Sequence, residues 1–178
     1  MGTDKGLIVQ DGKTWAQHAV DRLSSFAGEV FLSVNTDQFR IYEVHFTTNR
    51  LISDNDSLQM GGPLKGVLSA HLRYPLENWL VLACDMTAIN APLLQTLADT
   101  FQSSGYDAYV FRNEEGVQPL CGIYTSAAFE LVYSYYLQGK LIRFSMQHFL
   151  SLINTCYIDL PGNAKASFAN YNSPGDLS

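Results

Sequence analysis

Residues 79–86, Trp-Leu-Val-Leu-Ala-Cys-Asp-Met, form a nearly continuous apolar run that is interrupted near its end by one carboxylate, Asp85. Such a run predicts a strand buried on both faces, as in the parallel sheets of α/β folds. Open α/β sheets bind ligands beyond the carboxyl ends of their strands, so Asp85 would lie where a carboxylate suits a divalent cation. The alternative interpretation is a helix N-cap, because a helix-like stretch begins at Asn90. The run alone favours neither interpretation.

Composition places the chain in a broad class. A length of 178 residues with 47% hydrophobic and 16% charged residues predicts one sizeable core and a single domain. The net charge of -6 and the absence of any Lys/Arg run argue against a nucleic acid polymer or an anionic membrane as partner. No stretch approaches the roughly 20 apolar residues of a membrane span, and no signal peptide is recognisable. We therefore expect a soluble, cytoplasmic protein.

The cysteines and histidines do not suggest a metal site. The cysteines are three in number, widely spaced and set in apolar surroundings, which predicts reduced packing thiols: Cys84, Cys121 and Cys156. The histidines lack the spacing of metal ligands and are interpreted as surface or groove side chains: His18, His45, His71 and His148.

Strand-like and helix-like segments alternate along the chain, which is typical of βαβ units with right-handed crossovers and all strand ends at one edge. The predicted extended segments are 6–10, 29–34, 50–54, 79–86, 106–112, 118–124 and 155–159. The first predicted helix begins after the cap Thr14 and is ended by Gly28. The other predicted helices cover 37–46, 67–74, 92–101, 129–137 and 146–153. Pro119 predicts that its strand is an edge strand or contains a bulge. Ser173 is a candidate cap for a last helix starting at Pro174.

Polar and glycine-rich positions follow several predicted strands. Asn35 and Asp54 each close a strand, so both should lie at the edge that also carries Asp85. Residues 60–66, Met-Gly-Gly-Pro-Leu-Lys-Gly, precede a helix, and Pro63 suits its first position. Glycine-exposed amides at a helix start can bind an anion, and the alternative is an ordinary loop-to-helix cap.

Six short motifs occur in an order that resembles one family. They are Met-Gly-Thr-Asp-Lys-Gly-Leu at 1–7, Ile-Ser-Asp at 52–54, Gly-Pro-Leu-Lys-Gly at 62–66, Leu-Ala-Cys-Asp-Met at 82–86, Gln-Pro-Leu-Cys-Gly at 118–122 and Asn-Tyr-Asn-Ser-Pro-Gly-Asp-Leu at 170–177. Together they resemble the MobA-like family of molybdenum cofactor guanylyltransferases, within the wider sugar-nucleotidyltransferase-like enzymes. The resemblance implies a three-layer α/β/α Rossmann-like domain with a mostly parallel sheet.

The resemblance also implies a reaction. GMP would pass from GTP to the terminal phosphate of molybdenum-molybdopterin with release of pyrophosphate, in molybdopterin guanine dinucleotide biosynthesis. Mg²⁺ is the implied cofactor, GTP and molybdopterin are the implied partners, and transient contact with molybdoenzymes or other cofactor-biosynthesis proteins is expected. Two alternatives stay open, namely a related transferase that uses CTP or a sugar phosphate, and a non-catalytic remnant that binds a nucleotide or a partner.

Site residues carried over from the family fall into three groups. Asp85 matches the magnesium-binding aspartate and Lys5 matches the lysine at the nucleotide phosphates, so these two are the expected catalytic residues. The expected nucleotide-binding residues also include Asn35, Asp54, Gly62 and Gly66. On the molybdopterin side, the family motifs match Gln118, Asn170 and Asn172.

One departure concerns the N-terminus. Family members carry a strand and a glycine-rich loop directly before the motif at residues 1–7, and both are absent here. That loop would cradle the triphosphate, and its strand would lie in the middle of the sheet. We therefore expect residues 1–178 to be one N-terminally truncated domain that binds GTP weakly or folds poorly. A start codon assigned too late or an omitted N-terminus is favoured over an inactive remnant. A smaller departure is Thr87, where the family usually has proline.

Overall fold

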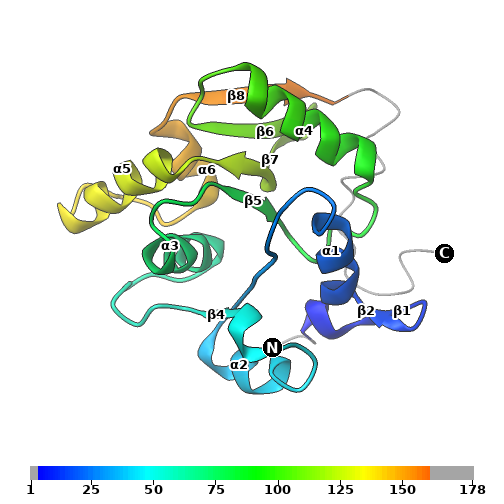
Figure 1. Ribbon diagram of the computed structural model, residues 1–178. Coiled ribbons are helices and arrows are strands. Elements are labelled where there is room, and N and C mark those ends of the chain that lie inside the picture. The colour runs from blue at the N-terminus through cyan, green and yellow to red at the C-terminus, as the bar shows by residue number, and fades with distance from the viewer. Residues whose placement is uncertain (1–3, 161–178) are drawn as a thin grey trace.

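The computed structural model describes residues 4–160, whose strands form a larger sheet, a smaller sheet and a two-stranded hairpin (Figure 1). The larger sheet has the strand order β5 (Trp79–Leu82), β7 (Gly116–Tyr124), β6 (Ala108–Asn113) and β8 (Thr155–Asp159). β7 runs antiparallel to both neighbours, whereas β6 and β8 are parallel. The smaller sheet consists of the parallel strands β3 (Leu32–Val34) and β4 (Leu51–Ser53). The predicted α/β class is confirmed, with antiparallel pairing around β7.

Helices cover both faces of the larger sheet, which gives the three-layer arrangement (Figure 1). Because side chains alternate along a strand, Ala108 and Val110 of β6 face one apolar core, and Tyr109 and Phe111 face another. The first core includes residues of α3 (Pro63–Arg73), α5 (Ser126–Leu137) and α6 (Met146–Ser151). The second includes residues of α1 (Trp15–Leu23) and α4 (Ala91–Ser103). α2 (Thr36–Tyr42) packs with β3 and β4 in a third, smaller cluster.

The start of the described chain is a compact turn and hairpin. η1 (Lys5–Leu7) leads into β1 (Val9–Gln10), which pairs with β2 (Lys13–Thr14). Asp11 and Gly12 connect the strands with φ values of 50° and 80°, as a two-residue hairpin requires. Thr14 then caps α1 in a capping box with Gln17, which confirms the predicted helix start.

Several element boundaries differ from the sequence prediction because caps decide them. α1 ends at Leu23 rather than near Gly28. α2 is Thr36–Tyr42 rather than 37–46, because the Asn35 side chain accepts the Gln38 N–H and starts the helix. α3 starts at Pro63 rather than at Val67, since Gly62 turns the chain with a φ of 75°. A short 3-10 helix, η2 (Thr48–Arg50), precedes β4.

Two burial predictions were wrong. All four residues of β5 are half-buried instead of fully buried, because β5 has a neighbour only on its β7 side within residues 4–160. His71, expected at the surface or in a groove, is only 1% exposed and stacks on Phe129 with ring centroids 5.5 Å apart. The spacing of neighbouring residues in the sequence could not predict either result, because the burial of β5 and of His71 depends on which distant element packs against them.

The proline in β7 marks a bulge. Val110 is opposite Gly122 and Phe111 is opposite Gln118, so residues 119–121 of this central strand have no opposite residue in β6, although Cys121 still pairs with Leu82 of β5. The second of the two alternatives predicted from Pro119 is therefore confirmed. The buried Tyr124 hydroxyl donates a 2.5 Å hydrogen bond to the Pro119 carbonyl and fixes the bulge from within the same strand.

Some predictions concern residues outside 4–160. The proposed Ser173 cap and the motif residues Asn170 and Asn172 lie outside the described part of the chain. Within the described part, none of the helices combines the length and the apolar character that crossing a membrane requires.

Candidate active site

Lys5 and Asp85 meet at the edge where β5 ends. The Lys5 ammonium donates a 3.0 Å hydrogen bond to Oδ2 of Asp85, and the two side chains are 37% and 22% exposed. Asp85 lies in the turn after β5, whereas the cap of α4 is Asn90, whose side chain accepts the Leu93 N–H. The N-cap interpretation of Asp85 is thus wrong. Its carboxylate is paired with the Lys5 ammonium at the sheet edge and does not cap a helix.

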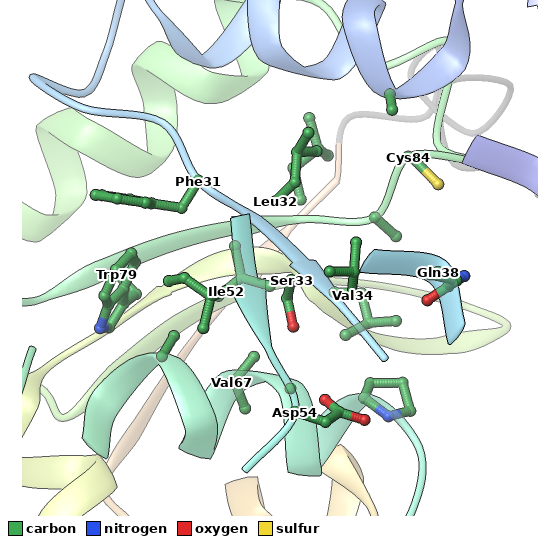
Figure 2. Close-up of a pocket in the computed structure, with 18 of the residues that line it drawn as sticks. Phe31, Leu32, Ser33, Val34, Gln38, Ile52, Asp54, Val67, Trp79 and Cys84 are labelled. Atoms are coloured by element: carbon green, nitrogen blue, oxygen red, sulfur yellow. The ribbon is translucent and has the colours of Figure 1, made fainter. Parts of the chain in front are cut away.

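A groove of about 450 Å³ lies between β3 and β5, and Figure 2 shows Gln38 and Cys84 toward one of its ends. Four of the sequence-predicted nucleotide residues line it, namely Asn35, Asp54, Gly62 and Gly66. Cys84, the residue before Asp85, lines it as well. These residues therefore come together around one groove, although Asn35 and Cys84 are 49 positions apart in the sequence.

Three donors hold the carboxylate of Asp4, next to Lys5. Its Oδ1 accepts the Tyr42 hydroxyl and the Gly6 N–H, each at 3.0 Å, and its Oδ2 accepts the Gln38 side-chain amide at 2.8 Å. Burial and the nearby Asp4 charge hold the pKa of Tyr42 well above its usual range, so its hydroxyl remains a donor. We call Asp4, Gln38 and Tyr42 the Asp4 clamp. It fixes the backbone from which Lys5 reaches Asp85.

Asp54 lies where β4 meets α3. Its N–H donates to the Val34 carbonyl at 2.9 Å, which ties the strand ends together. Burial raises the pKa of its carboxyl. The charge of the Lys65 ammonium lowers this pKa in part, and the charge of Asp56 raises it further. Gly66 faces this corner closely, since a Cβ there would collide with Ser33 Oγ and lie 3.8 Å from Asp54 Oδ1. The absence of a side chain at position 66 lets α3 approach β3.

The other predicted site residues are a helix-capping side chain, a glycine N-cap and a half-buried strand residue. The Asn35 side chain caps α2, so its carbonyl oxygen is already engaged by an amide of that helix. No side chain caps α3, because its N-cap is Gly62. Gln118 is half-buried and precedes Leu120 in β7, and the Leu120 carbonyl accepts the Ala83 N–H at 2.8 Å. Because β7 runs antiparallel to β5, residues of β7 before Leu120 lie beyond the end of β5. Gln118 therefore lies toward the same edge as Asp85.

Sequence reasoning missed the residues that position the site. Tyr42 and Gln38 act on Asp4 from 38 and 34 residues away, and Arg22 of α1 donates to the carbonyl of Thr87, 65 residues away. The last contact anchors the loop after Asp85, and burial lowers the pKa of Arg22 without removing its role as a donor. None of these pairs leaves a local pattern. Of these positioning residues, only Asp4 could have been suspected from the sequence, because it precedes Lys5 in the motif at residues 1–7.

The donor set fits a magnesium ion bound together with a nucleotide. Residues 4–160 contain no group of three or more His, Cys, Asp or Glu side chains suited to hold a metal alone. Mg²⁺ often takes only one or two carboxylates and completes its shell with water and substrate phosphates. Asp85 is a partly exposed carboxylate directly after the groove-lining Cys84, and such a carboxylate fits that second type of site.

Comparisons with known proteins identify the family of the chain. The MobA-like NTP transferase domain family matches residues 1–151. The chain is 30% identical over 177 residues to a molybdenum cofactor biosynthesis bifunctional protein of Synechocystis sp., covering 99% of this chain and 48% of that protein. It is also 30% identical over 119 residues to a molybdenum cofactor guanylyltransferase of Shewanella putrefaciens, covering 67% of this chain and 59% of that protein. The chain thus spans about half to three fifths of these curated relatives.

Solved structures support the fold. The molybdopterin-guanine dinucleotide biosynthesis protein A of Archaeoglobus fulgidus has a TM-score of 0.77 at 23% identity, over 99% of this chain and 88% of that one. The bifunctional IspDF of Campylobacter jejuni has a TM-score of 0.68 at 11% identity, over 98% of this chain and 48% of that one. The structural likeness extends across nucleotidyltransferase folds, and the family match covers most of the sequence. This chain belongs to the family of MobA-like NTP transferase domains.

Proposed function

We propose that this domain transfers a guanylyl group from GTP to molybdenum-molybdopterin. A terminal phosphate oxygen of molybdopterin would attack the α-phosphorus of GTP, the bond from that phosphorus to the bridging oxygen of the β-phosphate would break, and pyrophosphate would leave. The observation that carries the proposal is the Lys5–Asp85 pair at 3.0 Å, just beyond the carboxyl end of β5, which lines the groove. The names of the guanylyltransferase relatives support the choice of substrates.

The chemistry requires positioning and charge neutralisation rather than a covalent intermediate. Lys5 would turn from Asp85 to the phosphates when GTP enters, while the Asp4 clamp holds its backbone. Asp85 would then be available to hold Mg²⁺, which supplies neutralisation of the triphosphate charge when bound. In this proposal, Lys5 and Asp85 are an ion pair that nucleotide and cation separate.

The other site residues divide between the two substrates. Asn35, Asp54, Gly62 and Gly66 would contact the nucleotide from one wall of the groove mouth. Gln118, with Asn170 and Asn172 from outside the described residues, would face molybdopterin. We expect the reaction in the cytoplasm, with transient contact between this domain and molybdoenzymes or other cofactor-biosynthesis proteins that handle the product.

The test is a nucleotidyl transfer assay with Mg²⁺ and molybdenum-molybdopterin. GTP should yield pyrophosphate and a guanine dinucleotide product. Asp85→Asn and Lys5→Ala should each lower the rate roughly 100-fold or more, because each removes a charge that acts on the triphosphate. Asp99→Asn is the matched control, since Asp99 is an exposed carboxylate on α4 whose side chain accepts a hydrogen bond from Gln95, and it should keep full activity.

The same assay distinguishes the alternatives. Preferential turnover of CTP, or transfer to a sugar phosphate, would replace the guanylyl assignment with a related transferase. Full activity of Asp85→Asn would overturn the role of Asp85. Binding of GTP without turnover under all conditions, in a folded chain extended at its N-terminus, would show a non-catalytic nucleotide-binding domain.

A further inference from the structure

Exposed apolar side chains gather at the end of α5 and just beyond it. Leu137, the last residue of α5, is 66% exposed, Ile142 is 79% exposed, and Phe144 is exposed as well. None of residues 131–144 lines the groove between β3 and β5. Large apolar residues that gather at the surface, unlike single scattered ones, mark interaction sites. The end of α5 is therefore a candidate interaction surface separate from the candidate active site.

The backbone of this region is held in a fixed conformation. α5 ends in a Schellman motif, with Gly139 at a φ of 67°. The N–H of Gly139 donates to the Tyr136 carbonyl at 3.0 Å. The N–H of Lys140 donates to the Tyr135 carbonyl at 2.8 Å, and the next residue, Leu141, is buried in the apolar core. The exposed apolar side chains before and after Leu141 therefore belong to an ordered surface rather than to a loose loop.

Tyr136 joins this surface to the rest of the fold. Its ring centroid lies 6.3 Å from that of Phe144, so the segment after the turn runs back beside α5. Its hydroxyl accepts the Gln59 N–H at 2.8 Å and donates to the Ser57 carbonyl at 3.3 Å. Figure 1 shows α5 at one flank of the molecule, with α1 and the hairpin at the opposite flank. The surface, which we call the α5 patch, consists of Tyr136, Leu137, Lys140, Ile142, Arg143 and Phe144.

Charge distinguishes the patch from the rest of the chain. The chain has 17 acidic and 11 basic residues, but residues 131–158 contain no Asp or Glu. Lys140 and Arg143 are both exposed, and neither forms an ion pair within residues 4–160. The nearest carboxylate along the chain, Glu130, lies 3.4 Å from His71 Nε2. Both basic side chains are therefore available to a carboxylate of another molecule.

We propose that the α5 patch binds an acidic, apolar segment of another protein. Apolar side chains of that segment would cover Leu137, Ile142 and Phe144, and its carboxylates would pair with Lys140 and Arg143. Burial of the apolar area supplies affinity in such a contact, while the paired charges orient the partner and select it. Aromatic and arginine side chains, which the patch contains, are enriched in protein interfaces.

Other occupants match the patch less well. A second copy placed symmetrically would bring the basic residues of two patches together, which is repulsive. An anionic membrane would gain about 1 kcal/mol from each basic side chain, against the repulsion of a chain with a net charge of -6. Residues 161–178 contain one acidic residue, Asp176, and no apolar run longer than Phe168-Ala169. An acidic segment of a different protein meets both the apolar and the basic side chains.

A random library of peptides about twelve residues long, roughly three helical turns, tests the proposal by selection on the 178-residue chain. Enriched peptides should combine Asp or Glu with large apolar residues. In a fluorescence anisotropy titration, Ile142→Asp should bind them roughly tenfold more weakly or worse, because the new carboxylate opposes both kinds of contact. Leu76→Asp is the matched control, since Leu76 is 87% exposed outside the patch, and it should leave the affinity unchanged.

Three results of this selection would overturn the proposal. The first is that no peptide is enriched. The second is that the enriched peptides are basic or uncharged. The third is that acidic peptides are enriched but bind Ile142→Asp as tightly as they bind the parent chain.

Reversal of the charges tests the electrostatic part. Lys140→Glu combined with Arg143→Glu should weaken binding of the acidic peptides roughly tenfold or more, and selection on this variant should enrich basic apolar peptides instead. Arg40→Glu, at an exposed arginine of α2, is the control and should change neither result. An equal loss of affinity in Arg40→Glu would trace the effect to net charge and contradict the proposal.

Stability measurements separate binding from a structural role of the same residues. Basic residues just after a helix end can offset the helix dipole, and apolar residues can pack against the fold. Because the Ile142 side chain is 79% exposed, the urea midpoint of Ile142→Asp should equal or exceed that of the parent chain. A clearly lower midpoint in Ile142→Asp would show that this side chain serves the fold, and the docking role would be withdrawn.

Competing occupants give separate outcomes, each of which would replace the proposal. Binding to phosphatidylglycerol vesicles that Ile142→Asp abolishes would assign the patch to a membrane. A dimer that Ile142→Asp dissociates in sedimentation equilibrium would assign it to a second copy. Tighter peptide binding after removal of residues 161–178 would assign it to that segment. No nucleotide enters these measurements, so their result stands apart from the success or failure of the transferase assay.

Discussion

The hydroxyl of Tyr42 lies 3.0 Å from Oδ1 of Asp4, and the same carboxylate oxygen accepts the Gly6 N–H at 3.0 Å. Tyr42 is buried in the cluster between α2 and β3, so this contact ties Asp4 and η1 to a packed helix. The hydroxyl also occupies the position that a Cβ of residue 6 would need. Gly6 and Tyr42 therefore form a matched pair around Asp4.

Tyr42→Phe should lower the free energy of unfolding by about 1 kcal/mol, the usual net contribution of one hydrogen bond. It should also weaken nucleotide binding, because Lys5 follows Asp4 directly. Urea unfolding and a GTP titration measure the two effects. Tyr157→Phe, in an exposed tyrosine of β8, is the control and should change neither. Unchanged nucleotide affinity in Tyr42→Phe would show that the clamp does not position Lys5.

Asp54→Asn should stabilise the fold at neutral pH. Burial raises the pKa of Asp54 above its ordinary value of 3.8, so the folded state binds the proton more tightly than the unfolded state. The stability that this preference provides is present below pH 3.8 and is lost as pH rises through the higher folded pKa. The asparagine variant lacks this loss. Its urea midpoint should exceed that of the parent at pH 7, and the difference should shrink toward pH 3.5.

The same variant should bind nucleotide less well if Asp54 serves the site. Asp56→Asn is the comparison, because Asp56 is an exposed carboxylate two residues away. A lower urea midpoint for Asp54→Asn at pH 7 would mean that the carboxylate is stabilised by contacts with its surroundings rather than opposed by its burial.

Gly122→Ala should lower stability by roughly 1–3 kcal/mol, the range for overpacked sites. A Cβ at position 122 would lie 2.6 Å from both the Tyr109 carbonyl oxygen and Val110 Cγ1, where β7 crosses β6 beside the bulge. Gly61→Ala is the control, since no atom lies within 4 Å of its added Cβ. Thermal unfolding of both variants is the measurement. Equal midpoints would show that β6 can move aside.

The thiol of Cys84 should react slowly despite its place in the groove. Burial and the neighbouring Asp85 and Asp4 charges raise its pKa to about 11, so only about one thiol in a thousand is ionised at pH 8. Iodoacetamide labelling of Cys84 should therefore accelerate about tenfold per pH unit between pH 8 and pH 10. Cys121, fully buried with its pKa raised to about 12, should stay unlabelled in the native protein. A flat pH profile for Cys84 would exclude a raised pKa.

Local sequence signals predicted most elements of the fold. Thr14 and the turn at Asp11-Gly12 located α1 and its hairpin because caps and turns depend on neighbouring residues. Pro119 predicted the bulge because proline cannot donate to the ladder. Motif order then suggested which strand ends form the site, and the structure places Lys5 against Asp85 and gathers Asn35, Asp54, Gly62 and Gly66 around the groove.

Contacts between distant segments were not predictable in this way. The exposure of β5 depends on what lies between it and β3, and the burial of His71 depends on Phe129, 58 residues away in the sequence. Likewise, Tyr42 and Arg22 act through single hydrogen bonds to distant partners, which no residue spacing encodes. The sequence pattern specified the elements, and the packing between elements specified the positioning residues.

The Lys5–Asp85 pair joins positions 80 residues apart. Asp85 follows a strand of the larger sheet, and Lys5 is held through the Asp4 clamp by the helix that covers the smaller sheet. The pair can therefore form only after the two sheets have docked, and closing so long a loop is among the slower steps of folding. A partly folded form in which the two sheets have not docked should therefore lack the pair, so the candidate site would be completed late in folding.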